Sequence, residues 1–262
     1  MSKTHPLIAT ILKRTSIRKF KVKKIPETDV NRIVDCGQRA PTGGNSQLYT
    51  LIEVKDKTLR KKITEICHNQ EFIYEASHFF VICTDIRRLE KVIQYVEEDP
   101  KCSLDGTLSR FMFGIMDASF VAQNMVIAAE ALGYSSIYIG SVTTKIKEVC
   151  ELLKLPKGVL PVVGLALGVP AEQPPLRPRL PKEIIWQIDR YQDPSSEKLA
   201  QAIEHMDEIL RLEGYYEKYG GDPKDEYFWS THMCKKLMVE TLENAEQIQK
   251  QGVQHQSFLE NF

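Results

Sequence analysis

The chain has 262 residues and carries 35 Lys plus Arg against 35 Asp plus Glu, so it has no formal net charge. A neutral chain lacks the basic field that attracts nucleic acid or an anionic membrane surface, so we expect neither as a partner. The length fits one large domain or one domain with an extended tail. The six cysteines show no metal-ligand spacing and follow no secretory signal. This predicts reduced thiols, a cytoplasmic protein and no metal site.

Helical signals dominate the first fifty residues. Pro6–Lys13 reads as a short helix that leads into a basic segment, and Pro26 opens a second helix with apolar residues at three- and four-residue spacing. Residues 41–46 then read as a loop, because Pro, Gly, Asn and Ser favour turns.

Four short apolar runs rich in β-branched residues predict strands at 49–54, 79–83, 135–139 and within 159–169. Helices are expected between them, at 58–67, 112–132 and 145–153. The helix at 112–132 is apolar on nearly every side, which predicts that it lies in a core. Its polar residues, among them Asp117 and Glu130, argue against a membrane span.

The composition changes after Pro170. Four prolines between 174 and 181 predict an extended surface arm, because proline lacks the N–H that a helix or central strand needs. Two helices are expected beyond it, at 197–219 and 232–251, divided by the linker at 220–223. We therefore predict a single domain over 1–262, with a core at about 8–170 and a C-terminal arm and helices at about 171–262.

Arg14, Ser16 and Arg18 form the first candidate site, which we call the phosphate clamp. In an extended segment alternate side chains point to one side, so the two guanidiniums and the hydroxyl could converge on a phosphate. The alternative is a solvated basic turn, which is the usual role of a charge run.

Two further segments could hold an anionic ligand. The loop Pro41–Gln47 contains two glycines that allow close backbone approach, although it could also be an ordinary turn. It matches neither a P-loop nor the dinucleotide fingerprint. Arg177 and Arg179 flank a proline, and the alternative for them is a soluble linker. Together, the basic pairs and the glycine loop indicate a bound anionic group of some size.

Two motifs together resemble the opening of the nitroreductase superfamily: residues 14–20, RTSIRKF, followed by residues 40–47, APTGGNSQ. Residues 138–140, YIG, and 176–181, LRPRLP, resemble its larger subgroup, which includes oxygen-insensitive NADPH nitroreductases and flavin reductases. The resemblance implies an α+β fold with a central mixed β-sheet surrounded by helices. It also implies a homodimer with FMN at the subunit interface.

The resemblance assigns roles to the candidate residues. The clamp would hold the FMN phosphate together with Arg177 and Arg179. Loop residues would approach the flavin or its ribityl chain, some of them across the dimer, and Gln70 matches a glutamine that contacts the flavin ring. The loop residues are Thr42, Gly43, Asn45 and Gln47, and the residues bordering the other side of the ring are Tyr138, Ile139, Gly140 and Ser141.

The resemblance implies an FMN-dependent oxidoreductase that uses NADPH or NADH. In the family's ping-pong mechanism, hydride passes from the nicotinamide to the flavin and then to a nitroaromatic, a quinone or free flavin. No catalytic side chain is required, because FMN carries the chemistry. Ser141 and Thr143 depart from the glycine and arginine that the subgroup often has, and Arg14 stands where it commonly has histidine.

The sequence leaves the donor and two other classes of function open. Lys218 and Lys224 are the only substitutes for the arginines that some relatives use to bind the 2′-phosphate of NADPH. The alternatives are a flavin-binding sensor or carrier with little catalysis, and a phosphate- or nucleotide-binding protein without flavin.

Overall fold

A computed structural model describes residues 4–96, 108–212 and 228–234. The chain divides into two compact units, one up to Pro174 and the other from Pro175 onward.

The first unit is built on a four-stranded sheet in the order β1-β2-β4-β3. The strands are β1 (Tyr49–Glu53), β2 (His78–Asp85), β3 (Ser135–Ile139) and β4 (Val159–Gly168). All three pairings are antiparallel, and β2 is buried along its whole length between β1 and β4. The predicted α+β fold is confirmed, but the sheet is not mixed within the described residues. Parallel pairing is limited to a bridge between Ser16 and Ser136.

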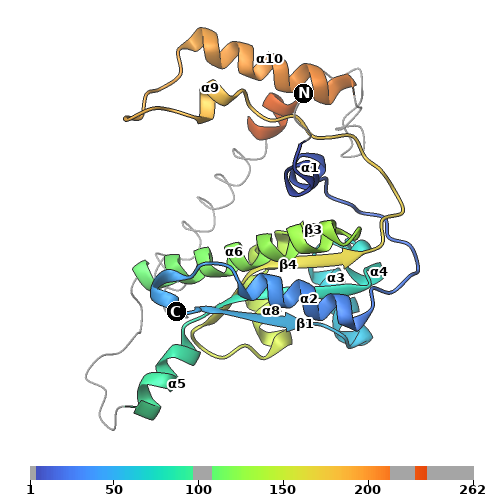
Figure 1. Ribbon diagram of the computed structural model, residues 1–262, viewed down its shortest axis with the longest axis vertical. Coiled ribbons are helices and arrows are strands. Elements are labelled where there is room, and N and C mark those ends of the chain that lie inside the picture. Colours follow the sequence, from blue (N-terminus) through green and yellow to red (C-terminus); the bar gives the residue numbers. More distant parts are fainter. Residues whose placement is uncertain (1–3, 97–107, 213–227, 235–262) are drawn as a thin grey trace, which may run out of the picture. The chain divides into compact units, whose positions relative to one another are not determined.

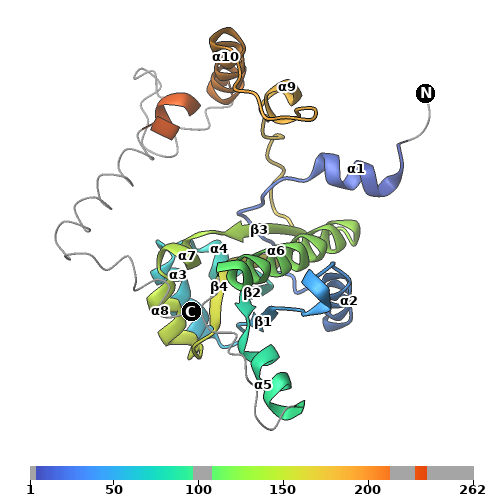
Figure 2. The same ribbon diagram turned by 90° about the vertical axis from the view of Figure 1, so that its left-hand side faces the viewer.

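Helices cover both faces of the sheet, as Figure 2 shows. On one face lie α2 (Glu27–Gln38) and α6 (Leu108–Ala131), packed over alternate strand residues that include Phe80 and Leu165. On the other face lie α3 (Lys57–Ile66) and α8 (Ile146–Leu153), packed over Phe79 and Ala166. Successive strand residues point to opposite faces, so one apolar strand serves two cores.

The described residues of the first unit contain four further α-helices and one 3-10 helix. They are α1 (Pro6–Lys13), η1 (Gly43–Asn45), α4 (Phe72–Glu75), α5 (Arg87–Val96) and α7 (Ser141–Thr144). The strands and the longer helices fall where their patterns predict them, with ends that differ by a few residues, whereas α4, α5 and α7 were not predicted. Figure 1 labels α1, α4 and α5 on the ribbon, and Figure 2 labels α7.

Helix α6 has one buried face and one exposed face. The buried face packs close to β2 at Gly114, where an added Cβ would lie 1.8 Å from the Thr84 hydroxyl. On the other face Met112, Phe113 and Phe120 are 43–53% exposed, so the predicted core helix contributes one side to the core of the single chain. By length and composition α6 could cross a membrane. Its packing against α2 and the sheet, and its buried Asp117, are instead those of a core helix.

The second unit begins in the proline-rich arm, where residues 175–181 form no helix or strand. Its helices are α9 (Lys182–Ile185) and α10 (Ser196–Leu212), and Met206 and Leu210 of α10 pack with Leu180 and Trp229. Residues 213–219, the linker at 220–223 and most of the predicted helix at 232–251 lie outside the described residues, as do Lys218 and Lys224.

Candidate functional site

The phosphate clamp lies beside the start of β3. Ser16 forms a parallel bridge with Ser136, and the Ile17 N–H donates to the Ser136 carbonyl at 3.1 Å. Ile17 is buried while Arg18 is exposed, which is the alternation expected of an extended segment. The Glu172 carboxylate accepts from the backbone N–H groups of Arg18 and Lys19 and so fixes this extended conformation. The predicted extended backbone is therefore present.

Among the residues that the structure describes, none makes a hydrogen bond or ion pair with the side chain of Arg14 or Arg18. Arg14 lies close enough to Tyr138 and Glu130 to act on both electrostatically. Burial raises the Glu130 pKa to about 7, although Arg14 and a hydrogen bond from Ser136 oppose the shift. Two arginines with unused donors suit an anion that the chain itself does not supply.

Gln70 and Ser141 meet just beyond the other end of β3. The Gln70 Nε2 donates to the Ser141 hydroxyl and to the Cys67 carbonyl, both at 2.9 Å. From Ser136 to Ser141 the chain advances five residues, or about 16 Å at the rise of a strand. Gly140 is exposed, with nothing within 4 Å of the position of an added Cβ. The site is therefore elongated, with cationic donors at one end and an open, uncharged surface at the other.

The loop at 42–47 is held by a buried carboxylate on α6. Asp117 is 1% exposed and accepts from the Gly43 N–H at 3.1 Å and the Leu48 N–H at 2.9 Å. Asn45 and Gln47 both have positive φ, a conformation that costs energy for residues other than glycine. Arg88 adds a bond to the Gln47 carbonyl at 2.7 Å. The loop has a defined shape that several elements maintain.

This loop and the clamp lie at different places along α6. Asp117 holds the loop and Glu130 lies beside Arg14, and 13 residues of one helix separate them, or about 20 Å. Along β3 the structure places Arg14 and Ser16 near the start of the strand, Tyr138 within it, and Gln70 with Ser141 beyond its end, whereas Thr42, Gly43, Asn45 and Gln47 lie in the loop held at Asp117. Ile139 is buried in the core, so its side chain is turned away from the surface of the site.

Comparisons with known proteins identify the family. Residues 11–169 match the model of the nitroreductase family, and residues 177–256 match its C-terminal domain. The chain is 32% identical to the oxygen-insensitive NADPH nitroreductase of Salmonella typhimurium, over 90% of this chain and 92% of that protein. It is 35% identical to the FMN reductase (NADPH) of Bacillus subtilis, over 70% of this chain and 74% of that protein. The chain belongs to the nitroreductase family.

Solved structures agree with this membership. NfrA1 of B. megaterium superposes with a TM-score of 0.80 and 32% identity, over 92% of this chain and 98% of that chain. The NADPH:FMN oxidoreductase of Vibrio harveyi complexed with NAD⁺ superposes with a TM-score of 0.76 and 27% identity, over 89% and 92% of the two chains. The family and the fold predicted from the sequence are confirmed, and so is the class of enzyme, an NAD(P)H-dependent oxidoreductase.

Arg177 and Arg179 belong to the second unit, so their predicted place at the nitroreductase phosphate site stays a prediction. The Arg179 guanidinium donates to the carbonyls of Arg177 and Pro178, at 3.3 and 2.8 Å.

Sequence reasoning missed three residues that shape this nitroreductase site: Asp117, Arg88 and Glu130. Asp117 and Glu130 are the acidic residues of an otherwise apolar helix, and they were read only as evidence against a membrane span. A buried carboxylate requires donors, so that pattern could have indicated a partner loop. Arg88 follows β2 and lies in none of the motifs, so the sequence gives no signal for it.

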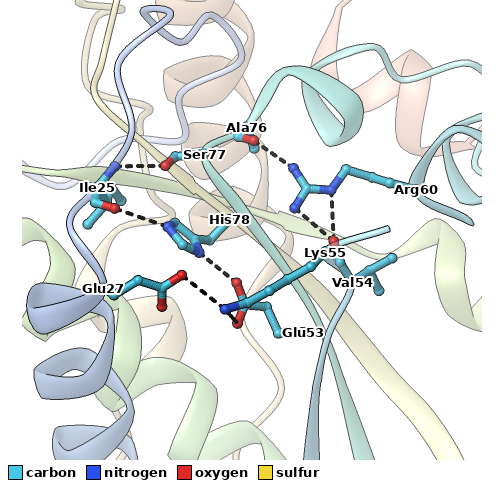
Figure 3. Close-up of polar contacts among 9 residues, drawn as sticks. All are labelled: Ile25, Glu27, Glu53, Val54, Lys55, Arg60, Ala76, Ser77 and His78. Carbon is cyan, nitrogen blue, oxygen red and sulfur yellow. Dashed lines mark hydrogen bonds and ion pairs between the residues drawn. The ribbon is translucent and has the colours of Figure 1, made fainter. Parts of the chain in front are cut away.

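A second polar cluster lies where β2 begins, and Figure 3 shows its contacts. His78 contacts Glu53 at 2.6 Å and the Ile25 carbonyl at 3.2 Å, and Arg60, which is 3% exposed, donates to the carbonyls of Val54 and Ala76. Its side chains bond to one another and to the backbone, so this cluster ties the segment before α2 and the helix α3 to the sheet. We refer to it as the Arg60–His78 cluster.

Proposed function

We propose that this chain binds FMN and passes electrons from NADPH or NADH to small acceptors such as nitroaromatics, quinones or free flavin. The observation that carries the proposal is the elongated site along β3, with free guanidiniums at the clamp and Gln70 with Ser141 at the far end. An elongated ligand with a phosphate at one end and a ring at the other fits this distribution of donors. When bound, FMN supplies the hydride and electron chemistry.

The chain's own residues would bind and orient the cofactor. The phosphate clamp offers a phosphate the donors of Arg14, Ser16 and Arg18. Arg177 and Arg179 would add two further positive charges. Tyr138 borders the site with its hydroxyl bonded to Gln123 at 3.2 Å, and burial raises the Tyr138 pKa, so the phenol stays neutral. Donor and acceptor would use the same open surface in turn, which is the basis of a ping-pong order.

The homodimer would complete the site. The loop at 42–47 is held at Asp117, about 20 Å along α6 from Glu130 beside the clamp, so within one chain it does not reach a phosphate at the clamp. Met112, Met116 and Phe120 are spaced four residues apart on the uncovered face of α6 and are 38–53% exposed, and α1 has no buried residue. A contiguous apolar face of this kind favours a protein interface. A second copy would cover this face and bring its loop to the site.

The visible absorption spectrum of the purified protein tests the cofactor and the donor together. We expect a flavin spectrum that bleaches under anaerobic conditions on addition of NADPH or NADH and recovers on addition of a nitroaromatic or a quinone. A colourless protein that does not bind added FMN would overturn the proposal.

A flavin sensor or carrier is the second candidate, because Ser141 and Thr143 alter the side of the site where an acceptor would bind. Full FMN occupancy with only slow bleaching by both coenzymes would favour it. The neutral charge and the five described cysteines, all of them free, suit a cytoplasmic enzyme of either kind.

A further inference from the structure

The contacts of Gln70 leave it only one atom to offer a ligand. A side-chain amide carries two N–H donors on nitrogen and an acceptor oxygen. One contact of Nε2 is the Cys67 backbone carbonyl at 2.9 Å, and a carbonyl can only accept, so the atom that faces it must be the nitrogen. The other contact of Nε2 is the Ser141 hydroxyl, also at 2.9 Å. Both N–H groups are therefore used inside the protein.

Ser141 also neighbours a buried thiol. Its oxygen accepts from Gln70, and Ser141 lies close enough to Cys67 to oppose the rise in the pKa of that thiol. Cys67 is fully buried, and burial raises the pKa of its thiol, so the sulfur is not a thiolate that could draw the serine away as an anionic acceptor. The Ser141 hydroxyl therefore serves the Gln70 amide as an acceptor.

We propose that Ser141 is a positioning residue that locks the Gln70 amide, so that Gln70 presents only its Oε1 acceptor to the flavin. No described residue donates to that oxygen, and Gln70 is only partly buried. Whatever Gln70 touches must then be an N–H or O–H donor, and the flavin ring offers N–H groups. Without the Ser141 hydroxyl, one N–H of Gln70 loses its partner and the amide can turn. This inference rests on the proposed function.

A double-mutant cycle on FMN affinity tests whether Ser141 acts through Gln70. We expect Ser141→Ala and Gln70→Ala each to raise the FMN dissociation constant about 3- to 10-fold, as for the loss of one or two hydrogen bonds. The double variant should bind no more weakly than Gln70→Ala alone, because residues in one network couple. The midpoint potential of the bound flavin should shift in Ser141→Ala and Gln70→Ala alike.

Thr144→Ala is the matched control, because Thr144 lies on the same short helix and its hydroxyl donates to the Ser141 carbonyl at 3.0 Å without contacting Gln70. Its FMN affinity and potential should equal those of the wild type. Losses that multiply in the double variant, or an unchanged affinity in Ser141→Ala, would overturn the inference. If Ser141→Ala does not fold, Ser141→Gly takes its place in the cycle. Failure of the wild-type protein to bind FMN would instead count against the proposed function.

Discussion

Two polar regions lie at the same end of the sheet, and they differ in the hydrogen-bond partners of their arginine side chains. In the Arg60–His78 cluster, at the start of β2, the Arg60 guanidinium makes three hydrogen bonds to backbone carbonyls. At the start of β3 the clamp guanidiniums of Arg14 and Arg18 bond to no described residue. A guanidinium that is satisfied by the backbone stabilises the fold, whereas one with free donors can bind a ligand. The difference lies in the partners, since both regions use the same residue type.

Removing Arg60 should have the largest effect. Arg60→Met keeps much of the apolar stem but leaves the buried carbonyls of Val54 and Ala76 without their donor. We expect a loss of about 3 kcal/mol in the free energy of unfolding, measured by urea denaturation. Lys55→Ala is the control, because Lys55 pairs with Glu27 and Glu53 while 59% exposed, and its loss should cost much less than the loss of Arg60. Equal losses in the two variants would show that the buried hydrogen bonds of Arg60 stabilise the fold no more than the exposed ion pairs of Lys55 do.

Arg18→Ala should show the reverse pattern. FMN binding should weaken by about 2 kcal/mol, or roughly 30-fold, because a charge-assisted contact to phosphate is lost. The stability of the cofactor-free protein should stay within about 0.5 kcal/mol of wild type, because the side chain is exposed and bonds to no described residue. Flavin fluorescence titration measures the first quantity and urea unfolding the second. Lys19→Ala, an exposed neighbouring cation, should change neither by a comparable amount, and an unchanged FMN affinity in Arg18→Ala would contradict the clamp.

Asp117→Asn should weaken the loop at 42–47 rather than the clamp. One carboxylate oxygen becomes an NH₂ group, so either the Gly43 or the Leu48 N–H loses its acceptor inside the core. We expect a loss of about 2 kcal/mol in unfolding free energy, with proteolysis near the loop faster than in the wild type. Ser119→Ala is the control on the same helix, because its exposed hydroxyl bonds only to its own helix at Ile115. Unchanged stability in Asp117→Asn would show that the loop does not depend on this carboxylate.

The comparison also shows which parts of the structure the sequence could predict. The strands and long helices follow from local patterns, and the clamp residues lie close together in the chain, so both were predicted. The pairings Gln70–Ser141, Gly43–Asp117 and Arg14–Glu130 join residues 71, 74 and 116 positions apart, and no local pattern specifies them. The exposed face of α6 was missed for a related reason, because periodicity reports which positions are apolar and not whether they are covered within the same chain.

Glu130→Gln should have the smallest effect. We expect it to change how the free energy of unfolding depends on pH. Burial raises the Glu130 pKa from 4.5 to about 7, so the folded chain favours the neutral acid. The stability that this form provides is fully present below about pH 4.5 and is lost as the pH rises through 7. Urea unfolding at pH 5 and pH 8 should show the wild type losing about 1 kcal/mol more than Glu130→Gln, after a discount for partial exposure. The exposed control Glu65→Gln should follow the wild type.

If FMN phosphate binds beside Arg14, saturating FMN should enlarge the difference in unfolding free energy between wild type and Glu130→Gln, because ionised Glu130 would repel the phosphate. Parallel curves for wild type and Glu130→Gln would show that the folded chain does not raise the pKa of Glu130.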